Sequence, residues 1–167
     1  MTRNLQDLST AQRALWDAYR ATQPEDIGPR FLEAFHFCDN AADADELAAL
    51  VEAGTKRATA ALVAAHTAER VPLPQPGALS IVTDFAGQPR CIIRTQRVDV
   101  MPFSQVDAAF AATEGEGDGS LAFWQRAHRA FFGRECARLG IAWHDEQDVV
   151  CERFELVWRA EAVAPAP

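Results

Sequence analysis

Lysine is almost missing from the sequence, since Lys56 is the only lysine beside fifteen arginines. Arginine therefore fills nearly every cationic position, and a single lysine can mark a place where a guanidinium is unsuitable. A buried lysine amine can lose its proton, whereas a guanidinium stays charged in proteins. Lys56 is thus a candidate for proton transfer, with a solvated surface lysine as the alternative.

Cysteine is also scarce, and the four cysteines form no C-x-x-C pair. Neither they nor the four histidines have the spacing of a zinc site, so we expect buried thiols in a reducing cytoplasm. No apolar run approaches the roughly 18 residues of a spanning helix, and the first residues lack the apolar segment of a signal peptide. The sequence predicts a cytoplasmic protein with no metal, no organic cofactor and no membrane partner.

Acidic residues outnumber basic ones, and the formal charge of the 167-residue chain is −8. The imbalance is uneven, because residues 1–53 carry −6, residues 54–139 carry +2 and residues 140–167 carry −4. Binding to duplex nucleic acid depends on many phosphate contacts, so no duplex DNA is expected as a partner. The middle segment can still hold a small basic pocket for one nucleotide or a short single strand.

Hydrophobic periodicity and turn residues predict a mixture of helices and strands without a regular β-α-β order. Such a mixture favours an α+β fold with a small, mostly antiparallel sheet or barrel. We expect helices over 9–21, 41–53, 58–68, 107–113 and 120–139, and strands over 31–38, 79–84, 91–100 and 149–158.

Two segments have the residue types of a chemical site. Lys56 and Thr59 are three residues apart, so a helical turn would place them on one face, where an amine can activate a hydroxyl; the alternative is a helix cap beside solvated cations. The acidic, glycine-rich loop 114–119 fails the calcium-loop pattern. Ser120 or Asp118 can cap the next helix, whose N–H groups then face an anion, with a solvated loop as the alternative.

A histidine is the third candidate, since His128 lies between Arg126 and Arg129 in sequence. It falls on the apolar side of the predicted 120–139 helix, and we expect a hydrogen-bonded core residue there. His36, on a predicted strand, has the same interpretation. The sequence contains no G-x-S-x-G, Walker or H-E-x-x-H motif.

Ordered blocks of sequence between residues 31 and 158 resemble the ASCH family, in particular its larger bacterial branch. Their order is kept over the whole segment, which makes chance a poor explanation. The blocks read FxD at 37–39, ADELAALV at 44–51, GTKRATA at 54–60, PxPGxLSIVxD at 74–84, MPFxxVDAxFA at 101–111, EGEGDGSLxxW at 114–124, FFxRE at 131–135 and VVCERF at 149–154.

The resemblance implies a PUA-like fold, a small and mostly antiparallel β-barrel with flanking helices. It places the ASCH domain at residues 31–158, after an N-terminal helical extension at 1–30 and before a flexible tail at 159–167. It also implies a link to RNA, with a modified nucleoside or single-stranded RNA as partner. The oligomeric state stays open, a dimer included.

The resemblance further implies candidate residues for catalysis and binding. Some smaller members of the family remove the acyl group from N4-acetylcytidine with a Lys and a Thr in G-x-K-x-x-T and a later Glu. Lys56, Thr59 and Glu114 match this set, and Glu116 is a close rival of Glu114. In the resulting hypothesis a neutral Lys56 activates Thr59, and Glu114 orients Lys56 or protonates the leaving nitrogen. The predicted substrate-binding residues are Arg57, Glu116, Ser120, Trp124 and Arg134.

Three functions are compatible with these residues. An amidohydrolase on acylated cytidine is the first, and the acidic charge favours its small substrate. A metal-independent ribonuclease for single strands, an activity also linked to the larger branch, is the second. A noncatalytic regulator that binds RNA or a nucleotide is the third.

Overall fold

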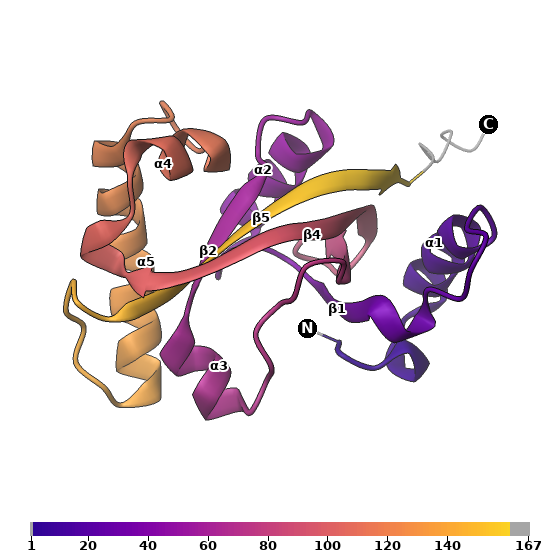
Figure 1. Ribbon diagram of the computed structural model, residues 1–167, viewed down its shortest axis with the longest axis horizontal. Helices are drawn as coiled ribbons and strands as arrows, with labels where there is room; N and C mark the ends of the chain where they lie inside the picture. The colour runs from indigo at the N-terminus through magenta and orange to yellow at the C-terminus, as the bar shows by residue number, and fades with distance from the viewer. Residues whose placement is uncertain (1, 161–167) are drawn as a thin grey trace. The chain divides into compact units, whose positions relative to one another are not determined.

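The computed structural model describes residues 2–160, and over this range the chain forms five α-helices and five strands (Figure 1). The expected α+β class is confirmed. The helices are α1 (Thr10–Arg20), α2 (Ala41–Glu52), α3 (Val63–Glu69), α4 (Ala108–Glu114) and α5 (Leu121–Leu139). The strands are β1 (Phe31–Phe35), β2 (Ala58–Leu62), β3 (Leu79–Thr83), β4 (Pro89–Pro102) and β5 (Asp148–Arg159), and 3-10 turns cover Leu5–Asp7, Gly28–Arg30 and Phe103–Gln105.

The strands make one sheet in the order β1-β3-β4-β5-β2. β1 pairs with β3 in parallel, whereas the β3–β4 and β2–β5 pairs are antiparallel, so the expected antiparallel character predominates. Closing a barrel requires the first and last strands to pair. Within the described residues β1 and β2 are the ends of the order, and the sheet is therefore open rather than closed into the expected barrel.

Contacts divide the chain into two compact units. The first contains the residues up to Glu52, Ala78–Arg94 and the chain from Leu156 onward. Its helix α1 begins with a capping box in which Ser9 and Gln12 satisfy each other's backbone N–H groups. The apolar side of α1 packs against β1, β3 and β4 in a core that includes Leu15, Trp16, Tyr19, Ala34, Ile81 and Ile92.

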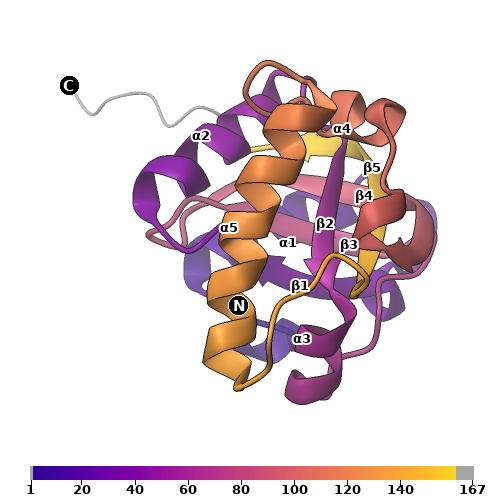
Figure 2. The ribbon, with the colours of Figure 1, turned by 90° about the vertical axis from the view of Figure 1, so that its left-hand side faces the viewer.

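The second unit contains Ala53–Gly77 and Thr95–Glu155. Its strand β2 pairs with β5, and α5 lies across β2 (Figure 2). Ser120 caps α5 at its start, and Gly140 ends it in the left-handed conformation. The core of this unit joins the two strands to α4 and α5, and includes Ala58, Leu62, Phe103, Phe110, Trp124, Phe132, Val149 and Cys151.

The helix predicted over 58–68 is wrong in its first half. Ala58–Leu62 is strand β2, and the helix α3 begins only at Val63. The alanines of this segment favour a helix when it is taken alone. Pairing with β5, in the register Ala58↔Arg153 to Leu62↔Val149, overrides that preference.

The remaining elements follow the prediction to within a few residues, the hairpin of β3 and β4 included. Part of the predicted flexible tail is ordered, since Arg159 still belongs to β5. Residues 161–167 of that tail lie outside the described residues.

The four cysteines are free thiols. Cys91, Cys136 and Cys151 are buried as expected, whereas Cys38 is partly exposed. Burial raises the pKa of Cys91 and of Cys151 to about 12, so both thiols stay protonated at neutral pH. Between residues 2 and 160, no helix combines the length and the apolar character needed to cross a membrane.

Candidate functional site

Lys56 lies two residues before the start of β2 at Ala58. The backbone N–H of Arg57 donates to the carbonyl of Thr113 over 3.0 Å, and the carbonyl of Arg57 accepts from the N–H of Phe154 over 2.9 Å. These two bonds hold Arg57, the residue directly before β2, between β5 and the end of α4. Lys56 is thereby held beside the loop that begins at Glu114.

Two glycines shape this loop so that its carboxylates can turn toward Lys56. Gly115 ends α4 in the left-handed conformation at φ 65°, and a Cβ there would lie 2.7 Å from the carbonyl oxygen of Thr55. Gly117 has φ 56°, and its Cβ would lie 2.4 Å from the ring of Phe123. Side chains at either position are excluded by both strain and space. The E-G-E-G spacing therefore serves close packing around the site.

Lys56, Glu114 and Glu116 form a buried cluster. The ammonium Nζ donates to Glu114 Oε2 over 2.9 Å and to Glu116 Oε1 over 2.5 Å. The exposed fractions of the three side chains are 1% for Lys56, 0% for Glu114 and 16% for Glu116. Glu116 is thus the member of the cluster that reaches solvent.

Helix α5 supports Glu114 from the other side. The indole Nε1–H of Trp124 donates to Glu114 Oε1 over 3.0 Å. His128 lies one turn further along, with Nε2 at 3.6 Å from the same oxygen and Nδ1 at 3.0 Å from the carbonyl oxygen of Trp124. The imidazole stacks on the indole with ring centroids 4.1 Å apart. Glu114 is therefore held by Lys56 on one side and by α5 on the other. A carboxylate fixed in this way is suited to orienting the Lys56 ammonium.

The charges in the cluster shift the pKa values of its three members in different directions. Burial is the largest influence on Lys56 and lowers its pKa, but the charges of Glu114 and Glu116 outweigh it and raise the pKa above 10.5. Burial favours the neutral form of Glu114, yet Lys56 and the neighbouring groups on α5 lower its pKa below 4.5. Burial and the charge of Glu114 raise the pKa of Glu116 above 4.5. The expectation of a neutral lysine is therefore replaced by an ammonium beside a carboxyl group whose pKa is raised.

The structure does not bring Thr59 to Lys56 in the expected way, because no helical turn joins them. Within strand β2, successive residues point to opposite faces. Ala58 and Leu62 face the core that contains Trp124, so Thr59 lies on the other face, opposite Glu152 in the β2–β5 register. The catalytic role of Thr59 stays a prediction.

The predicted substrate-binding residues are dispersed. Arg57 is exposed, and Ser120 caps α5 by accepting from the N–H of Phe123 over 3.1 Å. Trp124 is 2% exposed and stacks between Phe103 and His128 in the core. Arg134 is exposed on α5, where it covers the ring of Phe131. Of this set, Glu116 contacts Lys56 directly and Trp124 contacts the cluster through Glu114.

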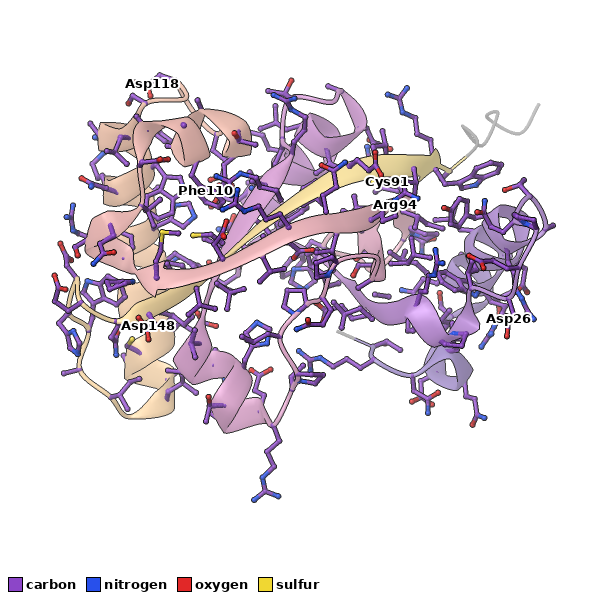
Figure 3. All side chains as sticks on the ribbon, viewed as in Figure 1. Asp26, Cys91, Arg94, Phe110, Asp118 and Asp148 are labelled. Atoms are coloured by element: carbon purple, nitrogen blue, oxygen red, sulfur yellow. The ribbon has the colours of Figure 1, made fainter. Side chains whose placement is uncertain are left out.

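The loop N–H groups expected to face an anion are partly engaged within the protein. The N–H of Gly119 donates to the carbonyl of Glu116, and the N–H of Ser120 donates to the carboxylate of Asp118. Figure 3 shows Asp118 on the loop that joins α4 to α5. The groups that contact the Lys56 ammonium are therefore the carboxylates of Glu114 and Glu116.

His128 was the third candidate from the sequence, which favoured a core role and did not place it with Lys56 and Glu114. It is the buried core histidine that was expected, but it also faces Glu114. The signal for it was the i, i+4 spacing of Trp124 and His128 on one helix face. Ligand atoms of Glu114, Glu116 and His128 lie within 4.8 Å of one another, which is a spacing suited to a metal ion. Lys56 places its own cation between the two carboxylates of this group.

Comparison with known proteins identifies the family of the chain. The family model for the ASCH domain matches residues 33–158. The chain belongs to the ASCH family. The ASCH family is linked to RNA binding, and the predicted PUA-like fold agrees with this membership.

Two solved structures are similar to this chain in fold and sequence. The ASCH domain from Lactobacillus crispatus JV V101 is 35% identical, with a TM-score of 0.86 over 92% of this chain and 98% of that one. A protein from Enterococcus faecalis V583 is 29% identical, with a TM-score of 0.79 over 88% of each chain. No curated protein matches the sequence. Lys56, Glu114 and Glu116 all lie within the residues that the ASCH family model matches.

Proposed function

We propose that this ASCH protein is an amidohydrolase that removes the acyl group from the N4 amine of an acylated cytidine. The observation that carries the proposal is the buried cluster of Lys56, Glu114 and Glu116, in which Glu116 alone reaches solvent. Gly54, Lys56 and Thr59 match the motif of small ASCH amidohydrolases in identity and spacing. The cluster supplies the two requirements of amide hydrolysis, a group that transfers protons and a fixed positive charge.

Glu116 is the proposed acid–base group. Its raised pKa brings it nearer to neutral pH than an ordinary carboxylate, which suits a group that must both accept and donate a proton. As a carboxylate it takes a proton from water while the water oxygen bonds to the acyl carbon. It then gives that proton to N4, the bond between N4 and the acyl carbon breaks, and cytidine and a carboxylic acid are released.

Lys56 and Glu114 have supporting roles in this mechanism. Lys56 is the cation closest to Glu116, and its ammonium offsets the negative charge that develops on the acyl oxygen. Glu114 holds the ammonium in place from the buried side. Water is the nucleophile, since Thr59 lies on the opposite face of β2.

The charge of the cluster favours a neutral base over a phosphodiester at this position. Lys56 brings one positive charge against two carboxylates, so a phosphate at Lys56 would meet net negative charge in a poorly solvated place. A ribonuclease needs a cation at the phosphate that reacts, which Lys56 does not offer. The amidohydrolase is accordingly preferred to the ribonuclease.

Incubation of the purified protein with N4-acetylcytidine in EDTA tests the proposal. We expect release of cytidine, followed by chromatography, from the native protein and at a similar rate from Thr59→Val. The matched control is Arg129→Met, which removes an arginine that is paired with Asp145 and stacked on Phe103. This control variant should release cytidine as the native protein does. No release by the native protein would overturn the proposal, and loss of release in Thr59→Val alone would replace water with Thr59 as nucleophile.

A further inference from the structure

Two arginines on neighbouring strands share a single carboxylate. Arg97 of β4 contacts Asp99 at 2.8 Å, and Arg153 of β5 donates from Nη1 to the same carboxylate over 3.0 Å. The side chains of Arg97, Arg153 and Asp99 are 68%, 30% and 22% exposed. Two guanidinium groups against one carboxylate leave one positive charge in excess. This Arg97–Asp99–Arg153 group is therefore an anion-attracting point in a chain of net charge −8.

Arg153 is held in a defined orientation by more than its ion pair. Its guanidinium lies over the ring of Phe110, 5.1 Å from the centroid, and Figure 3 shows Phe110 of α4 inside the second unit, toward β5. Stacking on an aromatic face leaves the edges of a guanidinium available for hydrogen bonds. One of its nitrogens is used by Asp99. The remaining donors form a planar fork of the kind that binds phosphate.

Arg153 is also a neighbour of the Lys56 cluster. Ala58 pairs with Arg153 in the β2–β5 register, and Lys56 precedes Ala58 by two residues. The carbonyl of Arg57, next to Lys56, accepts from the N–H of Phe154, next to Arg153, so the two cations flank one backbone hydrogen bond. On the helix side, Phe110 beneath Arg153 and Glu114 beneath Lys56 are one turn apart on α4. This backbone hydrogen bond and helix α4 both place the two cations in one neighbourhood.

We propose that Arg153, together with Arg97, binds the phosphate group of a nucleotide whose base lies at Glu116. The inference rests on the proposed function, because that function places the base. The phosphate is bound away from the carboxylates of the cluster, where its charge is matched by the excess guanidinium. The same chemistry serves a terminal phosphate of a mononucleotide or a phosphodiester of RNA, and it gives Arg153 the role of a specificity-determining residue.

Calorimetric binding of three unreactive ligands tests the phosphate site. Cytidine lacks phosphate, cytidine 5′-monophosphate has a terminal phosphate, and the dinucleotide ApC has only a phosphodiester. We expect at least one phosphate-bearing ligand to bind about tenfold more tightly than cytidine, as a charge-assisted contact allows. The preferred ligand shows whether the phosphate is terminal or part of a strand. Arg153→Met should remove the preference, and Arg97→Met should reduce it.

Controls separate this site from general charge effects. Arg129→Met removes an arginine with the same combination of an aspartate partner and a phenylalanine beneath it, and it should keep the preference. Arg153→Lys keeps the charge without the planar fork and should fall between the native protein and Arg153→Met. Equal affinity for all three ligands, with deacylation of N4-acetylcytidine intact, would overturn the phosphate site alone. A failure to bind any of them would overturn both it and the proposed function.

Discussion

Replacement of Lys56 by methionine is expected to lower the free energy of unfolding by about 3–5 kcal/mol, because it leaves buried carboxylates without their cation. Glu114 is fully buried and Glu116 is mostly so, and both accept hydrogen bonds from the Lys56 ammonium. Methionine fills a similar volume, so the loss reports charge rather than a cavity. For a protein of this length the expected drop in the unfolding temperature is roughly 10 °C, measured by thermal unfolding.

The double variant Lys56→Met/Glu116→Gln separates charge from packing. It removes one of the two stranded carboxylates and should recover part of the stability that Lys56→Met loses, since the two residues are coupled. Both variants should lack deacylase activity. A loss of less than about 1 kcal/mol in Lys56→Met would mean that the ammonium is not needed to keep the carboxylates buried, contrary to the account of the site.

The two glutamates are expected to respond in opposite ways to replacement by glutamine. Glu116→Gln should lower kcat/KM for deacylation by about 100-fold to 10,000-fold, as the loss of a general acid–base group does. Its stability at neutral pH should change by less than about 1 kcal/mol, because the raised pKa of Glu116 means that folding disfavours its charged form relative to the unfolded chain. Glutamine reproduces the neutral form.

Glu114→Gln is the matched control for this prediction. It should destabilise the protein by about 3–5 kcal/mol, because it removes the charge of the fully buried carboxylate that accepts a hydrogen bond from Lys56. The pKa of Glu114 is lowered in the folded state, so its stabilising effect is present above pH 4.5 and is lost as the pH falls through the folded value. If Glu116→Gln lost much stability but kept its activity, the assigned roles would be reversed. Glu116 would then be the structural carboxylate and Glu114 the acid–base group.

Local patterns predicted most elements of the fold, because the caps and periodicities involved are short-range. Ser120 before α5 has the capping role that the sequence indicated. The strand at Ala58–Leu62 was missed, since what makes it a strand is its pairing with β5, about ninety residues away. The open sheet was missed for the same reason, because closure depends on which strands pair at the edges.

The residues of the candidate site could be selected from the sequence, but their charges and pKa values could not be predicted from it. The lone lysine and the two glutamates of the loop could be selected from the sequence, and the structure brings them within hydrogen-bond distance. Which glutamate is buried depends on Trp124 and His128 of α5, whose approach no local pattern reveals. The charge of Lys56 could not be predicted either, because burial and two carboxylates act on it in opposite directions.

The protonation state of Lys56 is the most direct test of this account, and the sequence makes it measurable. With a single lysine in the chain, selective ¹⁵N labelling of lysine gives one side-chain NMR signal, which can be followed against pH. We predict that the folded protein keeps the ammonium signal beyond pH 10.5, whereas the denatured chain titrates near that value. The stabilising effect of Lys56 is then complete below pH 10.5 and is lost as the pH rises through the folded pKa. A folded midpoint below 10.5 would contradict the account, because it would show a lysine whose burial outweighs its two carboxylates.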